Sequence, residues 1–169
     1  MKVRRQHHAY TLIEVVIVAT VIAIAATAVL PMFGDTKAAK LRAAAQMLSA
    51  DIAYAQVESM AHGHNPYMLV FDTVSHVYHI ARASDPNTPV INPIGKQRYE
   101  VIFGQGRAMS MTDVKIANVS LNGDNIVTFG LYGQTDQTMP ATITLSCGEK
   151  SVVVTIDPYT GAAIVGSIQ

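Results

Sequence analysis

The chain has 169 residues, a formal net charge of zero and a single cysteine, Cys147. Its length allows one globular domain of ordinary size beside a helical anchor. Because no basic block lies beyond the extreme N-terminus, we expect no nucleic-acid partner. A single cysteine cannot form an internal disulfide, so the cysteine content does not indicate a redox compartment.

The N-terminal region combines a short basic segment with a long apolar stretch. Residues 1–9 carry three fixed positive charges, and the 21 residues from Tyr10 to Leu30 follow them directly. At about 1.5 Å per residue, this stretch forms a helix of roughly 31 Å, which matches a bilayer core of about 30 Å. We therefore predict a transmembrane helix over residues 10–34. Since short basic ends stay in the cytoplasm, the rest of the chain is expected on the other side of the membrane.

Glu14 is the single charge between Leu12 and Phe33. An ionised carboxylate inside a membrane segment costs about 2.5–3.5 kcal/mol on insertion scales, which predicts a partner that compensates it. A second interpretation is that Glu14 lies in the first turns of the helix, where headgroups and the positive end of the helix dipole stabilise an acid. The charge pattern leaves both interpretations open.

The junction Ala9-Tyr10, followed by Thr-Leu-Ile-Glu14 and an uninterrupted apolar run, resembles the class III leader of type IV pilins and type II secretion pseudopilins. This resemblance implies that residues 1–9 are a leader peptide, which a prepilin peptidase removes by cleavage between Ala9 and Tyr10. It implies N-methylation of Tyr10. It also implies that Glu14 neutralises the N-terminal amine of a neighbouring subunit and so acts in subunit assembly.

Pro31 stands where many pilins carry a proline, which implies a bend in the helix because proline lacks the backbone N–H. An ordinary helix boundary at Pro31 and Gly34 is the alternative.

A different cleavage site is the second alternative, because Ala26-Thr-Ala28 fits the A-x-A signature of a secretory signal peptide. Cleavage there would release a free exported protein, for example an enzyme. Glu14 and the length of the apolar run count against that cleavage.

A second helical pattern extends from Asp35 to Ala61, with apolar residues at three- and four-residue steps. Residues 35–63 are expected to form the amphipathic outer half of one long helix. Its apolar stripe predicts a sheet beneath it. Residues 64–169 are expected to form an antiparallel β domain, which makes the fold class α+β.

The β domain shows short β-branched and aromatic runs between turn residues. They predict strands at Tyr67–Phe71, Val77–Arg82, Tyr99–Phe103, Val114–Val119, Ile126–Phe129, Ala141–Cys147 and Ser151–Ile156, with a weaker strand at Ala162–Val165. Prolines in Ser84–Gly95 predict an exposed loop there. This order of elements resembles the minor pilin and pseudopilin group typified by the H component of type II secretion and its FimT-like relatives.

Catalytic and metal-binding patterns are absent from the sequence. The pairs His62-Gly-His64 and His76-Val-Tyr-His79 lack cysteine or helix-spaced carboxylate partners, so we expect no metal. Asp51 and Asp72 are interpreted as solvated charges rather than catalytic acids. We expect no cofactor and no enzymatic activity.

The resemblance implies a structural subunit in the inner membrane, with a cytoplasmic N-terminus and a periplasmic C-terminal domain. The expected role is that of a minor pseudopilin of type II secretion, and a minor type IV pilin is the alternative. Its expected partners are other pilin-like subunits, the prepilin peptidase and the assembly platform of the machine.

Overall fold

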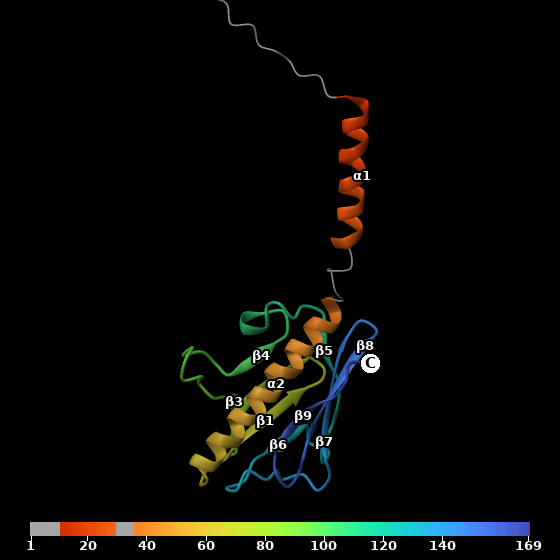
Figure 1. Cartoon of the computed structure of the whole chain (residues 1–169). Coiled ribbons are helices and arrows are strands. Elements are labelled where there is room, and N and C mark those ends of the chain that lie inside the picture. Colours follow the sequence, from red (N-terminus) through yellow and green to blue (C-terminus); the bar gives the residue numbers. More distant parts are fainter. Residues whose placement is uncertain (1–10, 30–35) are drawn as a thin grey trace, which may run out of the picture. The chain divides into compact units, whose positions relative to one another are not determined.

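The computed structural model describes residues 11–29 and 36–169. They belong to two compact units, Met1–Thr36 and Lys37–Gln169 (Figure 1). The first contains helix α1 (Leu12–Val29), and the second is formed by helix α2 (Thr36–Ala61) with the strands. The prediction that the two helices are halves of one long helix bent at Pro31 depends on residues 30–35, which lie outside the described residues.

Helix α1 covers the described part of the predicted membrane segment. Within residues 11–29 and 36–169, no helix combines the length and the hydropathy that a membrane span requires. The predicted span of residues 10–34 extends beyond the described residues at both ends.

Helix α2 begins one residue after the predicted start and ends at the predicted residue, Ala61. Its alanine-rich sequence has a high intrinsic helix propensity. Its buried side chains recur at three- and four-residue steps, so they form one face of the helix. The apolar members of this face are Leu41, Ala44, Ala45, Leu48, Ile52 and Ala55.

The β domain contains two antiparallel sheets, where the sequence led us to expect one. The first sheet has the order β3-β2-β1-β6, and β4 also pairs with β2. Its strands are β1 (Tyr67–Asp72), β2 (Val77–Arg82), β3 (Asp85–Pro89), β4 (Glu100–Ile102) and β6 (Ile126–Thr128). A short 3-10 helix, η2 (Gly106–Ala108), follows β4.

The second sheet has the order β5-β7-β8-β9. Its strands are β5 (Val114–Ser120), β7 (Ala141–Cys147), β8 (Lys150–Ile156) and β9 (Ala163–Val165). Along β7, buried residues alternate strictly with half-buried ones, as the sequence pattern predicts. The predicted C-terminal meander is therefore confirmed.

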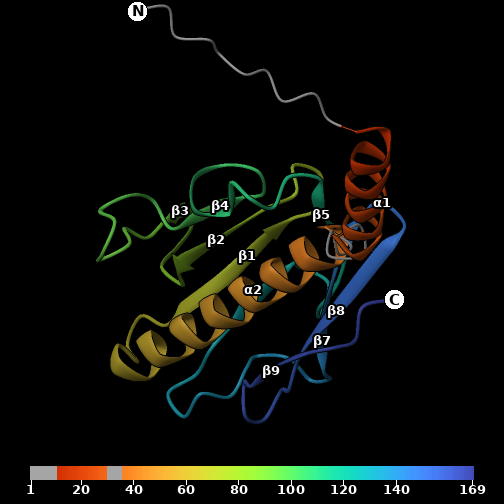
Figure 2. The same cartoon turned by 45° about the horizontal axis from the view of Figure 1, so that its top comes forward.

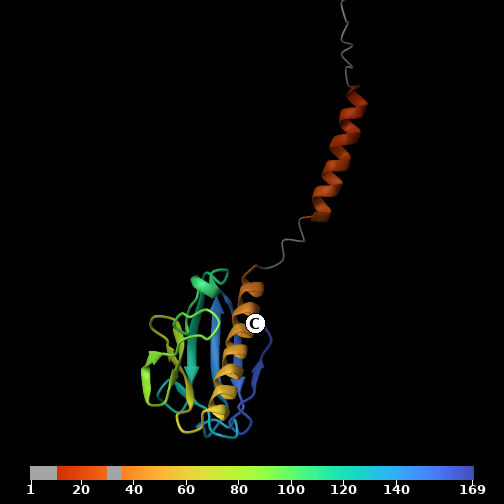
Figure 3. The ribbon, with the colours of Figure 1, turned by 90° about the vertical axis from the view of Figure 1, so that its left-hand side faces the viewer.

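Helix α2 runs along both sheets (Figures 2 and 3). Its buried face shares one hydrophobic core with side chains of the first sheet, such as Leu69 and Ile80, and of the second sheet, such as Ile143 and Val154. The α+β fold class is confirmed, and the buried face of α2 packs against both sheets.

Polar side chains of α2 attach its C-terminal half to the strands and loops. The Ser59 hydroxyl accepts the N–H of Tyr67 at 2.7 Å and donates to the Tyr67 carbonyl at 3.1 Å. The side-chain amide of Gln56 donates to the carbonyls of Gly133 and Thr160 at 2.7 and 2.6 Å. These bonds fix the end of the helix relative to β1 and to two loops.

The expectation of a loop throughout Ser84–Gly95 is wrong at its start, because β3 occupies Asp85–Pro89. Strand β3 pairs with β2 at the border of the sheet, with a register shift between Ala81 and Arg82. Proline is tolerated there because an edge strand needs hydrogen-bond donors on only one side.

Candidate functional site

The start of α1 carries the described part of the predicted assembly site. The Thr11 hydroxyl accepts the backbone N–H of Glu14 at 3.3 Å, and the Thr11 carbonyl accepts the N–H of Val15 at the same distance. This is the geometry of an N-cap residue. Thr11 and Glu14 also have the spacing of a capping box, a local sequence signal for the start of this helix.

Glu14 lies in the first turn of α1 and is exposed. It borders a groove on one face of the helix with four apolar residues, Val15, Val18, Ala19 and Ile22. Within residues 11–29 and 36–169, no side chain donates a hydrogen bond to the Glu14 carboxylate. The helix therefore presents one carboxylate at the end of an apolar surface. The other predicted site residues, Ala9, Tyr10 and Pro31, lie outside the described residues.

A second charged cluster lies inside the globular unit around Asp51, which is only 2% exposed. Its carboxylate accepts hydrogen bonds from the hydroxyls of Tyr78 at 2.7 Å and Tyr99 at 3.0 Å. Each terminal nitrogen of Arg107 donates to one oxygen of this carboxylate, and the bond from Nη1 to Oδ1 measures 2.9 Å. The interpretation of Asp51 as a solvated charge is wrong, because four donors from three side chains replace water around it.

Burial and charge act together on the side chains around Asp51. Burial, followed by the negative charge of Asp51, raises the pKa of Tyr78 well above its usual value. The same causes raise the pKa of Tyr99 to about 12. Burial tends to lower the pKa of Arg107, but its hydrogen bonds and ion pair with Asp51 outweigh burial and raise that pKa. At neutral pH both tyrosines therefore stay neutral donors and Arg107 stays charged.

The cluster joins segments that are distant in sequence. Asp51 belongs to α2, Tyr78 to β2 and Arg107 to η2. The Arg107 guanidinium also lies 4.6 Å from the centre of the Tyr99 ring. Because both oxygens of Asp51 are occupied by donors, this arrangement suits a structural ion pair rather than a general base.

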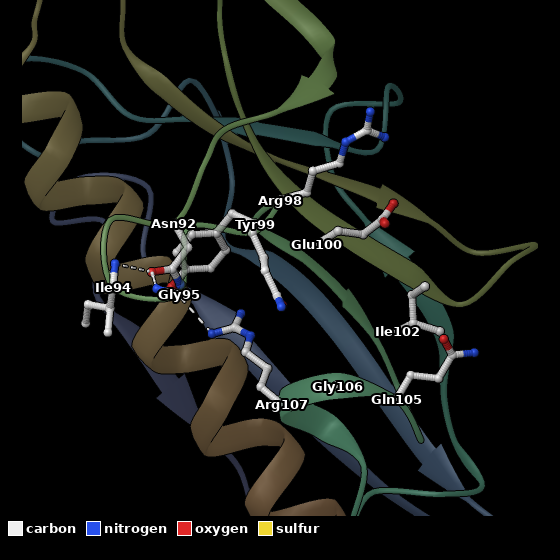
Figure 4. Close-up of a pocket in the computed structure, with 11 residues that line it drawn as sticks. Asn92, Ile94, Gly95, Arg98, Tyr99, Glu100, Ile102, Gln105, Gly106 and Arg107 are labelled. Carbon is white, nitrogen blue, oxygen red and sulfur yellow. Dashed lines mark hydrogen bonds between the residues drawn. The ribbon is translucent and has the colours of Figure 1, made fainter.

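A groove of about 430 Å³ lies beside this cluster (Figure 4). The turn around residues 92–97, strand β4 and the start of η2 form its walls, and Tyr99 and Arg107 contribute to its lining. No sequence pattern predicts this groove, because it depends on how the turn, β4 and η2 lie beside one another in the fold.

The histidines contact different segments of the chain. Nδ1 of His76 lies 3.0 Å from the Ile116 carbonyl, whereas Nε2 of His79 lies 2.9 Å from the Pro86 carbonyl. Nδ1 of His62 lies 3.4 Å from the Glu58 carboxylate. In the described part of the chain, no group of three or more histidine, cysteine, aspartate or glutamate side chains is arranged to hold a metal ion.

Comparison with known proteins gives one match. Residues 4–30 match the prokaryotic N-terminal methylation motif. No curated protein and no solved structure matches the chain. The motif supports a pilin-like protein, and it implies in general terms processing by a prepilin peptidase and assembly with other pilin subunits.

The Asp51 cluster predicts a large effect of Asp51→Asn on stability. Removing one partner of a buried pair costs about 3–5 kcal/mol, but water can partly solvate Arg107, so we expect a loss of about 2–3 kcal/mol. Denaturant unfolding of the full chain in detergent measures this loss. Asp113→Asn is the matched control, because the Lys40–Asp113 ion pair at 3.4 Å is exposed and is worth less than about 1 kcal/mol. Equal effects of the two substitutions would contradict the stabilising role of the cluster.

The raised pKa of Tyr99 predicts a loss of stability at alkaline pH. The folded chain keeps the Tyr99 proton at pH values where the unfolded chain, with a tyrosine pKa of 10.0, loses it. The stability that the protonated Tyr99 hydroxyl contributes is therefore fully present below pH 10 and is lost as the pH rises through about 12. Unfolding free energies measured across this window should fall less steeply for Tyr99→Phe than for the unmodified chain. Parallel pH profiles would count against a buried, neutral Tyr99.

Proposed function

We propose that the chain is a structural pilin-like subunit, a minor pseudopilin of a type II secretion system that assembles into a periplasmic filament. The observation that carries this proposal is the match of residues 4–30 to the N-terminal methylation motif. In this proposal residues 10–34 anchor the chain in the inner membrane, and the α+β domain lies in the periplasm. The protein works by assembly and has no catalytic activity.

The position of Glu14 supports assembly through the N-terminal helix. The carboxylate lies at the start of an apolar helix and has no donor side chain among the described residues. After cleavage before Tyr10, a neighbouring subunit would bring its N-terminal amine as the missing cation. Opposite charges attract strongly in a low-dielectric helix bundle, and an unpaired charge there is costly. The pair would therefore favour one register between subunits.

The exposed face of α2 supports packing between helices in such a filament. The residues opposite its buried face include Ala39, Ala50 and Ala53, which are all exposed. Small side chains let two helix backbones approach closely. This face of α2 therefore suits close packing against a helix of a neighbouring subunit.

Processing is tested by mass spectrometry of the protein extracted from membranes. The expected mature N-terminus is N-methylated Tyr10, because the motif implies cleavage after Ala9 and methylation of the new amine. A mature N-terminus at Val29 would instead indicate a signal peptide cleaved after Ala26-Thr-Ala28. An intact Met1 would contradict processing altogether.

The role of Glu14 is tested by Glu14→Ala. Insertion and cleavage should persist, because removing a charge makes the helix more apolar. Cross-links to neighbouring pilin-like subunits should be lost, and Glu14→Asp should have an intermediate effect because its carboxylate is one methylene shorter. Thr20→Ala is a control within the same helix and should assemble normally. Loss of secretion would support the type II machine, and loss of piliation the type IV pilus.

Normal cross-linking and function of Glu14→Ala would contradict the pairing. A glutamate stabilised only by the helix dipole is worth about 0.3–1 kcal/mol, so its removal would be almost silent.

A further inference from the structure

Strand β4 and the residues just before it, from Arg98 on, form one extended segment. One edge of this segment pairs with β2, and the other edge points away from β2. Tyr78 lies opposite Val101, and the N–H of Ile80 donates to the Tyr99 carbonyl at 3.0 Å. Backbone groups along a strand alternate between its two edges. The backbone N–H and C=O groups of Tyr99 and Val101 therefore point toward the neighbouring segments of the sheet. The backbone groups of the residues between and beside them point outward.

The outward groups belong to Arg98, Glu100 and Ile102. Among the described residues, only the Ile102 carbonyl has a hydrogen-bond partner, the N–H of Gln105 at 3.1 Å. The N–H and C=O groups of Arg98 and Glu100 remain available. An edge with available backbone groups is a template for pairing with another strand.

The groove of about 430 Å³ described above runs along this edge (Figure 4). Ile94, which is 93% exposed, and Ile102 supply apolar surface at the groove. The side chains of Arg98 and Glu100 are exposed, and within residues 11–29 and 36–169 neither forms an ion pair. The groove thus combines free backbone groups with one unpaired charge of each sign.

These charges select one register for pairing between two copies of the edge. If outward residues pair antiparallel, Arg98 can oppose Arg98, Glu100 can oppose Glu100, or Arg98 can oppose Glu100 of the second copy. The first two registers place like charges directly opposite each other, which is destabilising. The third register forms two opposite-charge pairs related by symmetry, and its two-fold axis passes at Tyr99.

We propose that the β4 edge is a self-association surface, on which a second copy of this chain adds its own β4 edge in the register that pairs Arg98 with Glu100. The contact is isologous, because the same surface is used by both copies. It involves few hydrogen bonds, so it rests on the membrane anchor of the proposed function, which would confine both chains to one membrane and raise their effective concentration. It does not depend on N-terminal processing or on Glu14.

Cysteine cross-linking of the full chain in membranes tests the register. Hydrogen-bonded antiparallel residues have Cα atoms about 5.5 Å apart, within the disulfide range of about 4.4–6.8 Å. Differently tagged Arg98→Cys and Glu100→Cys chains should form a mixed disulfide, about tenfold more than Arg98→Cys paired with the exposed control Lys115→Cys. Cys147 is buried in every chain and serves as the background.

Three results would overturn the proposal: no excess over the Lys115→Cys control, equal cross-linking of Arg98→Cys to itself, or cross-linking of Arg98→Cys to a different membrane protein instead. Repeating the experiment with Glu14→Ala separates the two proposals. Retained disulfides in that background support the β4 contact even when N-terminal assembly fails.

Charge reversal tests the pairing independently. Chains with Arg98→Glu should associate poorly with each other, and so should chains with Glu100→Arg, each about fivefold less than the unmodified chain. A mixture of the two variants restores opposite charges on both sides and should regain association. Co-isolation of two differently tagged chains measures this association. Any association through the N-terminal helices is the same in all samples. A mixture no better than either variant alone would overturn the charge pairing.

Discussion

The burial of one face of α2 against two sheets is the constraint on which the rest of the globular unit depends. That face includes Asp51, a charge that the core can accept only if donors surround it. Tyr78 from β2, Tyr99 and Arg107 supply these donors. This need for donors keeps η2, which carries Arg107, close to α2. It also keeps the segment that carries Tyr99 in place. The position of the β4 edge and its groove therefore follows from a charge in the core.

Two of the helix carboxylates, Asp51 of α2 and Glu14 of α1, have opposite surroundings. Asp51 receives all its donors from its own chain, so it contributes to a fixed domain. Glu14 lies on an apolar helix surface without a donor side chain among the described residues. In the proposed function, the missing donor belongs to a neighbouring subunit. One acid would then stabilise the fold, and the other would make assembly conditional on a partner.

The sequence predicted the elements whose local pattern matches their burial, and it missed those that depend on distant residues. Strands β2 and β7 have the predicted bounds, because alternation and turn residues mark them locally. Strand β3 was missed because proline usually ends a strand, and only its position at the border of the sheet makes proline acceptable. Asp51 was misinterpreted because Arg107 is 56 residues away. At the N-terminus, the motif match supports the predicted pilin-like leader and helix. The roles of Ala9, Tyr10, Glu14 and Pro31 stay predictions.

In the proposed function, Glu14 pairs with the N-terminal amine of a neighbouring copy of this chain. Zero-length carbodiimide cross-linking in membranes that contain a mixture of isotope-labelled and unlabelled chains tests it most directly. Mass spectrometry should find an amide bond between the N-methylated amine of Tyr10 and the Glu14 carboxylate, with the two peptides carrying different labels. An unmodified Glu14, or a bond found only within one chain, would contradict pairing between subunits.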